Sequence, residues 1–163
     1  MTTQKIAIGL IAIALFVGSL TAHAAELSAG VKAAERGDHS TALRICQQLA
    51  EQGNANAQSK LGHMYLFGWG VTQDYAPALK WLCKAANQGE ANSQAQLGAM
   101  YDSGWSGWDV AQDYVQAHMW YNLAAAQGIG YARKWRDRLA GKMTPAQIDE
   151  AHRLAREWKP KGK

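Results

Sequence analysis

The chain has 163 residues, of which 48% are hydrophobic and 18% are charged, and its formal net charge is +4 at pH 7. A chain of this length folds as one ordinary domain with a substantial core. The charge is only mildly basic, and no dense group of Lys and Arg alternates with aromatic residues, which argues against a nucleic-acid-binding protein. Part of the excess charge lies in a C-terminal tail with Lys159, Lys161 and Lys163, and tails of this kind are usually solvated.

The first 24 residues have the pattern of a secretory signal peptide. Lys5 precedes an apolar run from Ile6 to Leu20, and Ala22-His23-Ala24 is a small-x-small cleavage pattern. The run is shorter than the roughly 20 apolar residues of a comfortable bilayer span. We therefore expect cleavage near Ala24, a periplasmic or secreted protein, and no stable membrane span afterwards. An uncleaved anchor helix is the alternative.

The rest of the chain contains an internal repeat. Residues 53–62 (GNANAQSKLG) align with residues 89–98 (GEANSQAQLG) at a shift of 36, and after the next loop the shift becomes 39, as in Asp74 and Asp113. The second copy is longer because its loop holds three more residues around Trp105 and Trp108. Self-similarity at a fixed period predicts a solenoid.

Each repeat contains two helical patterns. Ala57, Leu61, Met64 and Tyr65 have the i, i+4, i+7, i+8 spacing of one helix face, and residues 75–86 show the same periodicity. Glycine inside a helix costs about 1 kcal/mol relative to alanine. Since Gly62 and Gly98 both occupy such positions, we expect two helices to approach closely there. Asp74 and Asp113 precede second helices and are predicted to cap them.

Looser units flank the two full repeats. We predict a signal peptide over 1–24, a partial repeat over 25–52, full repeats over 53–88 and 89–127, and a final unit over 128–163. In that final unit, Thr144-Pro145-Ala146-Gln147 has the pattern of a capping box with proline at the first helical position. The helix that follows is predicted to bury Ile148, Ala151, Ala155 and Trp158 and to act as the C-terminal cap that a solenoid needs.

These residues resemble the Sel1-like repeat family, a relative of the tetratricopeptide repeat. The family motifs A-x-x-x-L-G-x-M-Y, G-x-G-V-x-x-D and A-A-x-Q-G occur here as Ala57 to Tyr65, Gly68 to Asp74 and Ala85 to Gly89. The second copy departs at Ser93 and at the Trp105 to Trp108 insertion. The resemblance implies an all-α, right-handed superhelical solenoid of helical hairpins with a concave and a convex face. It also implies a scaffold that binds proteins or peptides.

The sequence predicts no catalytic residue, cofactor or metal site. It contains no HExxH, GxSxG, P-loop or paired-carboxylate signature. His118 aligns with Leu79 at an apolar-face position. We expect a half-buried, hydrogen-bonded packing histidine there rather than a ligand or general base.

Cys46 and Cys83 lie on the second helices of adjacent units. A disulfide between them would link one unit to the next and stabilise the fold by about 2–4 kcal/mol. Packed helices lie about 8–10 Å apart, whereas the Cα atoms of a disulfide lie within about 7 Å. The sequence therefore leaves open both a disulfide and two separate thiols.

Partner-binding candidates fall into two groups. Tryptophan is enriched in binding hot spots, so the loop residues Trp69, Trp105 and Trp108 are candidates. For Trp69 we favour a loop folded over its own side chain. For Trp105 and Trp108 a role as a partner anchor and a role in packing stay equally open. Polar positions beside the repeat core form the second group, and these are Asn56, Lys60, Asn92 and Gln96.

Three functions are compatible with these features. The first is an exported adaptor that binds a protein or peptide and has no chemistry of its own. The second is an envelope ligand-binding protein or an enzyme acting on cell-wall material, which would need a pocket with His118 facing a carboxylate. The third is a structural subunit of an envelope complex.

Overall fold

The computed structural model describes residues 22–104 and 111–161. These residues form helices and no strand. A helix over 22–35 is followed by α2 (His39–Glu51), α3 (Ala55–Phe67), α4 (Tyr75–Asn87), α5 (Ala91–Ser103), α6 (Tyr114–Ala126), α7 (Gly130–Ala140) and α8 (Pro145–Glu157). The predicted all-α fold is confirmed.

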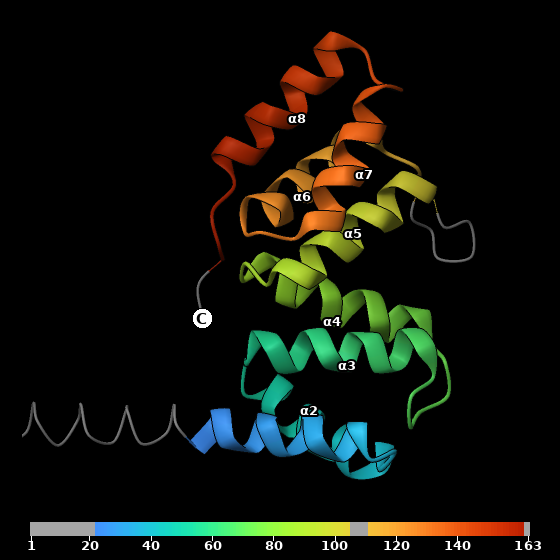
Figure 1. The fold of residues 1–163 in the computed structure, drawn as a ribbon, viewed down its shortest axis with the longest axis vertical. Coiled ribbons are helices and arrows are strands. Elements are labelled where there is room, and N and C mark those ends of the chain that lie inside the picture. The colour runs from blue at the N-terminus through green and yellow to red at the C-terminus, as the bar shows by residue number, and fades with distance from the viewer. Residues whose placement is uncertain (1–21, 105–110, 162–163) are drawn as a thin grey trace, which may run out of the picture.

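The helices stack in chain order from the N-terminal helix to α7 (Figure 1). Consecutive helices pack as hairpins, most extensively α3 with α4 and α5 with α6. This is the arrangement of a superhelical repeat, as predicted. Among the described helices, none is long and apolar enough to cross a membrane.

Polar side chains at the helix starts explain where the helices begin. Asp74 and Asp113 are the N-caps of α4 and α6, and their carboxylates accept one and two hydrogen bonds, respectively, from backbone N–H groups of the first turn. Thr144 and Gln147 form the predicted capping box of α8, with Pro145 at the first helical position. These predictions are confirmed, because a cap depends only on residues within one helical turn.

The two helix-interior glycines lie where helices approach closely. A Cβ at Gly62 would lie 2.7 Å from Cγ of Leu82, and one at Gly98 would lie 2.6 Å from Cδ1 of Tyr121. Real Cβ atoms essentially never come this near to another heavy atom, so each glycine lets the hairpin close. The predicted close approach is confirmed at both positions.

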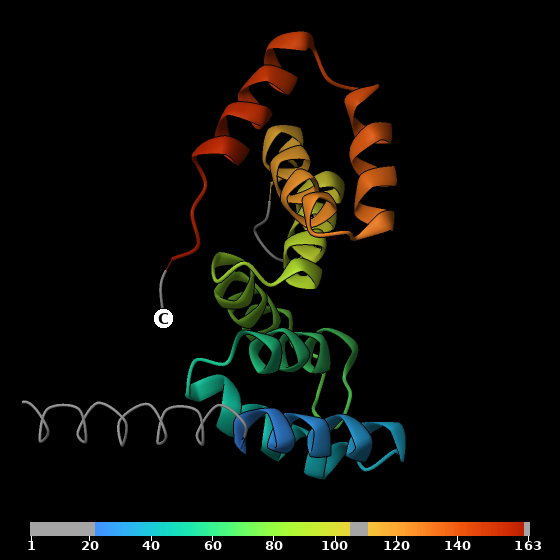
Figure 2. The ribbon, with the colours of Figure 1, turned by 60° about the vertical axis from the view of Figure 1, so that its left-hand side comes forward.

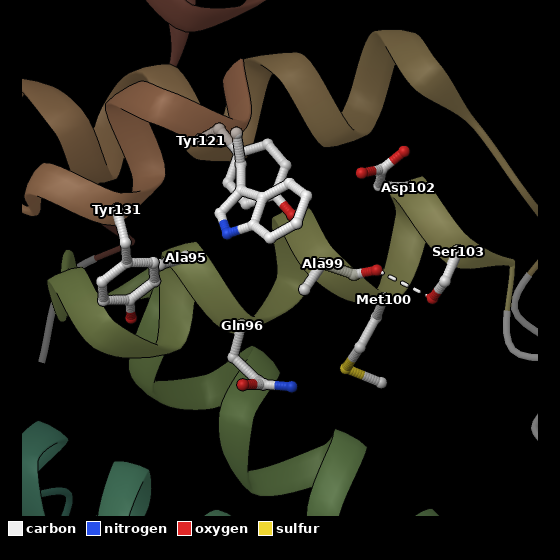
Figure 3. Close-up of a pocket in the computed structure, with 9 residues that line it drawn as sticks. Ala95, Gln96, Ala99, Met100, Asp102, Ser103, Tyr121 and Tyr131 are labelled. Atoms are coloured by element: carbon white, nitrogen blue, oxygen red, sulfur yellow. Dashed lines mark hydrogen bonds between the residues drawn. The ribbon is translucent and has the colours of Figure 1, made fainter. Parts of the chain in front are cut away.

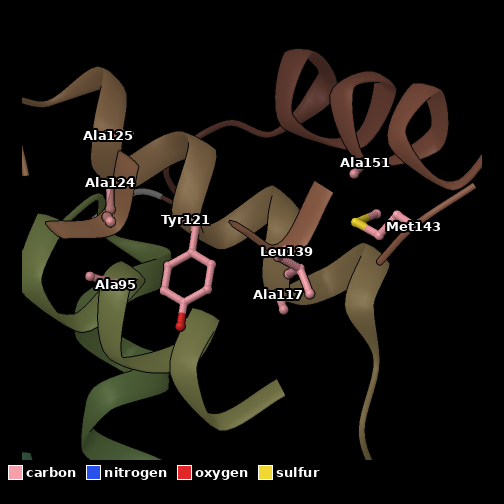
Figure 4. Close-up of a cluster of buried hydrophobic side chains, with 9 residues drawn as sticks. Ala95, Ala117, Tyr121, Ala124, Ala125, Leu139, Met143 and Ala151 are labelled. Carbon is pink, nitrogen blue, oxygen red and sulfur yellow. The ribbon is translucent and has the colours of Figure 1, made fainter. Parts of the chain in front are cut away.

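Three clusters of buried side chains run along the stack. The N-terminal cluster includes Cys46, Leu49, Leu61 and Met64, and the central one includes Leu66, Leu82, Leu97, Met100 and Trp120. The C-terminal cluster joins α5, α6, α7 and α8 around Tyr121, Leu139 and Ala151 (Figure 4). Small alanines fill much of the contact between helices, which lets the backbones pack tightly.

Buried glutamines connect successive hairpins. Gln58 donates from Nε2 to the Ala50 carbonyl oxygen, and its own Oε1 accepts from Gln88 Nε2. One repeat later, Gln94 donates to the Ala86 carbonyl oxygen and accepts from Gln127 in the same way. Burying an amide is favourable only when it is hydrogen-bonded, so this repeated network helps to set the register of the stack.

The two hairpin loops close alike although one is longer. Gln73 Nε2 donates to the Leu66 carbonyl oxygen at 2.7 Å, and Gln112 Nε2 donates to the Asp102 carbonyl oxygen at 2.7 Å. The three extra residues of the second loop therefore leave the flanking helices in phase.

The C-terminal helix turns back along the stack (Figure 2). α8 packs on α6, and the Trp158 ring meets Trp120 edge to face with centroids 6.3 Å apart. Trp158 also lies against Gly89, and the Lys161 N–H donates to the Asn87 carbonyl oxygen at 2.8 Å. The predicted cap thus reaches back as far as the end of α4.

Candidate partner-binding groove

Two adjoining hollows lie along the side of the solenoid formed by the first helix of each hairpin. One, the α5–α7 hollow, has a volume of about 370 Å³. The other, the α2–α3 hollow, has a volume of about 580 Å³ and is lined by the helix over 22–35, α2, α3 and parts of α5 and α7. Tyr131 lines both hollows, so we treat them as one groove.

The α5–α7 hollow has an apolar floor and polar ends. Ala99 and Met100 line it from α5, and the Tyr121 ring closes it from α6 (Figure 3). Tyr131 and Asp102 lie at opposite ends of the hollow in this view. Burial raises the pKa of the Tyr121 hydroxyl, and the negative charge of Asp102 adds to the shift. Tyr121 therefore stays neutral and offers a hydroxyl rather than a charge.

The α2–α3 hollow carries more polar groups. Ala42, Cys46 and Met64 line its apolar part, while Glu35 and Lys60 bring one charge of each sign. His63 also lines it, and His63 Nδ1 lies 2.8 Å from the Ser59 carbonyl oxygen. This half of the groove is suited to mixed polar and apolar contacts.

An aromatic row borders the α2–α3 hollow. The rings of His63 and Phe67 stack at 6.1 Å, and those of Phe67 and Trp69 lie 4.9 Å apart. The Trp69 loop packs on α2, since a Cβ at Gly70 would lie 2.8 Å from Cβ of His39. Even so, Trp69 is 50% exposed and Phe67 is 51% exposed. Trp69 thus packs against the end of α3, while half of its surface remains open to a partner.

Two buried hydroxyl groups and a partly buried carboxylate join α3 to the start of α5, next to the α2–α3 hollow that Ser59 lines. Ser93 Oγ donates to Ser59 Oγ at 2.9 Å, and Glu90 accepts from the backbone N–H groups of Asn92 and Ser93. Burial acts to raise the pKa of Glu90, but these hydrogen bonds outweigh it and hold the pKa below its usual range. The carboxylate therefore stays ionised and caps α5.

The structure places three of the four polar candidates in the groove. Lys60 and Asn92 line the α2–α3 hollow, and Gln96 lines the α5–α7 hollow. Asn56 is exposed and lines neither hollow. Trp105 and Trp108 lie outside the described residues, so their role stays a prediction.

Both cysteines are free thiols. Cys46 is buried in the N-terminal cluster, and Cys83 packs against the central cluster. Burial raises the pKa of both thiols, although Lys60 lowers that of Cys46 slightly. A raised pKa keeps a thiol protonated and unreactive. Among the residues described, no three His, Cys, Asp or Glu side chains are placed to hold a metal ion.

His118 differs from the expected half-buried, hydrogen-bonded histidine. It is only 2% exposed, and its Nδ1 has no hydrogen-bond partner among the described residues. The reason is that the ring faces the His152 ring of α8 instead of a carbonyl or carboxylate oxygen. His118 lines neither hollow.

Sequence reasoning missed the aromatic residues of α7. Tyr131 is 53% exposed and Trp135 is 40% exposed, and both line the α5–α7 hollow. The sequence did contain a signal for this surface. Tyr131, Trp135 and Arg138 have i, i+4, i+7 spacing, which places all three on one face of α7. That spacing alone does not say whether such a face is buried or open.

A family model described as the Sel1 repeat matches residues 27–54, 55–90 and 91–129. One similar solved structure is the crystal structure of c5321, a protective antigen present in uropathogenic Escherichia coli strains displaying an SLR fold. It shares 30% identity with this chain at a TM-score of 0.75 and covers 83% of it. This chain spans 29% of the length of that protein. A Sel1 repeat protein from Oxalobacter formigenes is 38% identical over 54% of this chain and 65% of its own, with a TM-score of 0.49. No curated protein matches the chain.

Proposed function

The chain belongs to the Sel1 repeat family, and on that premise we propose that it is a non-catalytic adaptor that binds a protein or peptide segment in the groove. The observation that carries the proposal is the continuity of the two hollows through Tyr131. Half-exposed aromatic residues border both hollows, and aromatic side chains supply much of the binding energy at interfaces.

The side chains in and beside the groove favour binding over catalysis. Tyr121 and the two thiols are held in their neutral forms by burial, so they are poor nucleophiles. His118, the residue on which the enzymatic alternative depended, lies in the α6–α8 interface and lines neither hollow. These placements favour the adaptor over the cell-wall enzyme.

We further propose that the adaptor acts in the periplasm or outside the cell, because residues 1–24 have the pattern of a cleavable signal. Mass spectrometry of the protein purified from its native host tests this directly. A mature N-terminus at Ala25 supports export, whereas an intact Met1 in protein recovered from the cytoplasmic fraction contradicts it.

The binding proposal is tested by affinity purification from native envelope extracts, followed by mass spectrometry. A groove variant, Tyr131→Ala with Trp135→Ala, should lose the partner. The matched control is Tyr75→Ala, because Tyr75 is also an exposed aromatic residue but lines neither hollow. Equal capture by both variants would contradict the groove as the binding site.

The same experiment separates the adaptor from a structural subunit. Substoichiometric capture of a client that dissociates on washing supports the adaptor. A stable complex of fixed stoichiometry would instead favour the subunit role.

A further inference from the structure

α7 presents a basic surface at one end of the groove. Arg133, Lys134, Arg136 and Arg138 lie within six consecutive residues that include a single acid, Asp137. Arg136 is already engaged, because its guanidinium donates to Asp137 and to Asn122. The other three side chains are exposed and form no ion pair within the part of the chain that the structure describes.

Two of these cations border the α5–α7 hollow. Lys134 and Arg138 follow Tyr131 by three and seven residues, so they lie on the same side of α7 as the two aromatic residues that line the hollow. The Arg138 guanidinium carbon lies 5.0 Å from the centroid of the Trp135 ring. Positive charge and exposed aromatic surface therefore meet at one place.

The carboxylates near this end of the groove form no ion pair with Lys134 or Arg138. Asp102 lies at the opposite end of the hollow from Tyr131 (Figure 3). Glu90 is ionised and its charge reaches Tyr131, but its carboxylate is held at the start of α5 and forms no ion pair with a described cation. Lys60 in the adjoining hollow adds a further positive charge, opposed there by Glu35. Within residues 22–104 and 111–161, Arg133, Lys134 and Arg138 form no ion pair, so the exposed face of α7 carries positive charge that is open to a partner.

We propose that the groove binds an acidic peptide segment, which places an apolar or aromatic side chain against Tyr131 and Trp135 and carboxylates against Lys134 and Arg138. This inference rests on the adaptor function proposed above and adds the chemistry of the partner. Burial of the aromatic surfaces supplies affinity, and charge complementarity supplies selectivity and speeds association. A concave hollow of about 370 Å³ has the size of a pocket that takes a bulky side chain.

The test uses the 163-residue chain and three fluorescent synthetic peptides of about 12 residues. The peptides share Leu and Trp anchors and differ only in carrying Glu, Gln or Lys at the remaining positions. In fluorescence anisotropy, the Glu peptide should bind about tenfold more tightly than the Gln peptide and lose this advantage in high salt. Equal binding of the two, or a preference for the Lys peptide, would overturn the inference while leaving the adaptor function in place.

Two kinds of variant, one that removes positive charge from the groove and one that removes negative charge, test the inference further. Lys134→Glu with Arg138→Glu should weaken the Glu peptide about tenfold or more. Asp102→Asn should leave its affinity unchanged or raise it, because a negative charge is removed from the hollow. Lys80→Glu is the control, since Lys80 is exposed on α4 and lines neither hollow. If Asp102→Asn weakens binding and the α7 variant does not, the polarity of the groove is the reverse of our proposal.

The last comparison in the anisotropy experiment uses a single-stranded oligonucleotide with the same net charge as the Glu peptide. Tighter binding of the oligonucleotide than of the Glu peptide would overturn the assignment to a peptide. If none of the three peptides binds, the inference is overturned as well. The native co-purification experiment would then decide the adaptor function separately. Circular dichroism of every variant verifies that its helices are retained.

Discussion

The imidazole rings of His118 and His152 meet edge to face at the α6–α8 interface, with centroids 5.2 Å apart. Burial, together with smaller effects of the charges of His152 and Arg136, lowers the pKa of His118 from 6.5 to about 4, against an opposing effect of Asp137. His118 is therefore neutral in the folded protein near pH 7.

This pair predicts that the protein loses stability in mild acid. Below about pH 6.5 the unfolded chain takes up a proton at His118, whereas the folded protein does not until about pH 4. The contribution of His118 to the free energy of unfolding should therefore fall across this window by about 3 kcal/mol and change little below it, where Glu90 begins to lose its own contribution. Urea denaturation between pH 7 and pH 4 measures the change.

The variant that isolates this effect is His118→Leu, because leucine occupies the equivalent position 79 of the previous repeat. Its stability should depend less steeply on pH than that of the wild type. Identical pH profiles for the two proteins would show that His118 titrates normally.

Gly98 is predicted to tolerate no side chain. Gly98→Ala places a methyl group 2.6 Å from the buried Tyr121 ring, so the ring or the helix must shift to make room. Overpacking of this kind costs about 1–3 kcal/mol. Gly130→Ala is the matched control, because a Cβ at Gly130 meets nothing within 4 Å. Thermal denaturation should show a clear loss of stability for Gly98→Ala and no loss of stability for Gly130→Ala.

The glutamine network predicts a cost for truncating Gln94. Gln94→Ala removes the hydrogen bonds that Gln94 makes with the Ala86 carbonyl oxygen and with the Gln127 amide, and it truncates a fully buried side chain. Each intramolecular hydrogen bond contributes about 0.5–1.5 kcal/mol, so we expect a loss of about 1–3 kcal/mol. Gln96→Ala, two residues away and with its side chain in the groove, should change stability by less than about 0.5 kcal/mol. Equal losses in chemical denaturation would mean that the network contributes nothing specific.

The two thiols should be unreactive in the folded protein. Burial raises the pKa of Cys46 and Cys83, so few thiolates form near neutral pH. Ellman's reagent should therefore label them slowly under native conditions and rapidly in denaturant, with two thiols per chain in the denatured state. If the denatured, unreduced protein from its native host releases no free thiol, the cysteines are paired.

Several features could be read directly from the residues because they are determined within one or two helical turns. The spacing of Leu61, Met64 and Tyr65 predicts a helix, Thr144 and Gln147 predict its start, and Gly98 predicts a close contact that the structure contains. Repetition strengthened these inferences, since the same local pattern occurs in successive hairpins.

The sequence by itself determined the helices, their caps and the repeat, because those depend on neighbours in the chain. Tertiary structure alone decided which helix faces remain open. Tyr131 and Trp135 line a hollow, whereas His118 lies under α8, and both outcomes depend on how a later element packs against an earlier one. Exposure is set by contacts between hairpins and by the turn of α8 back toward α4, and no single helical pattern contains that information.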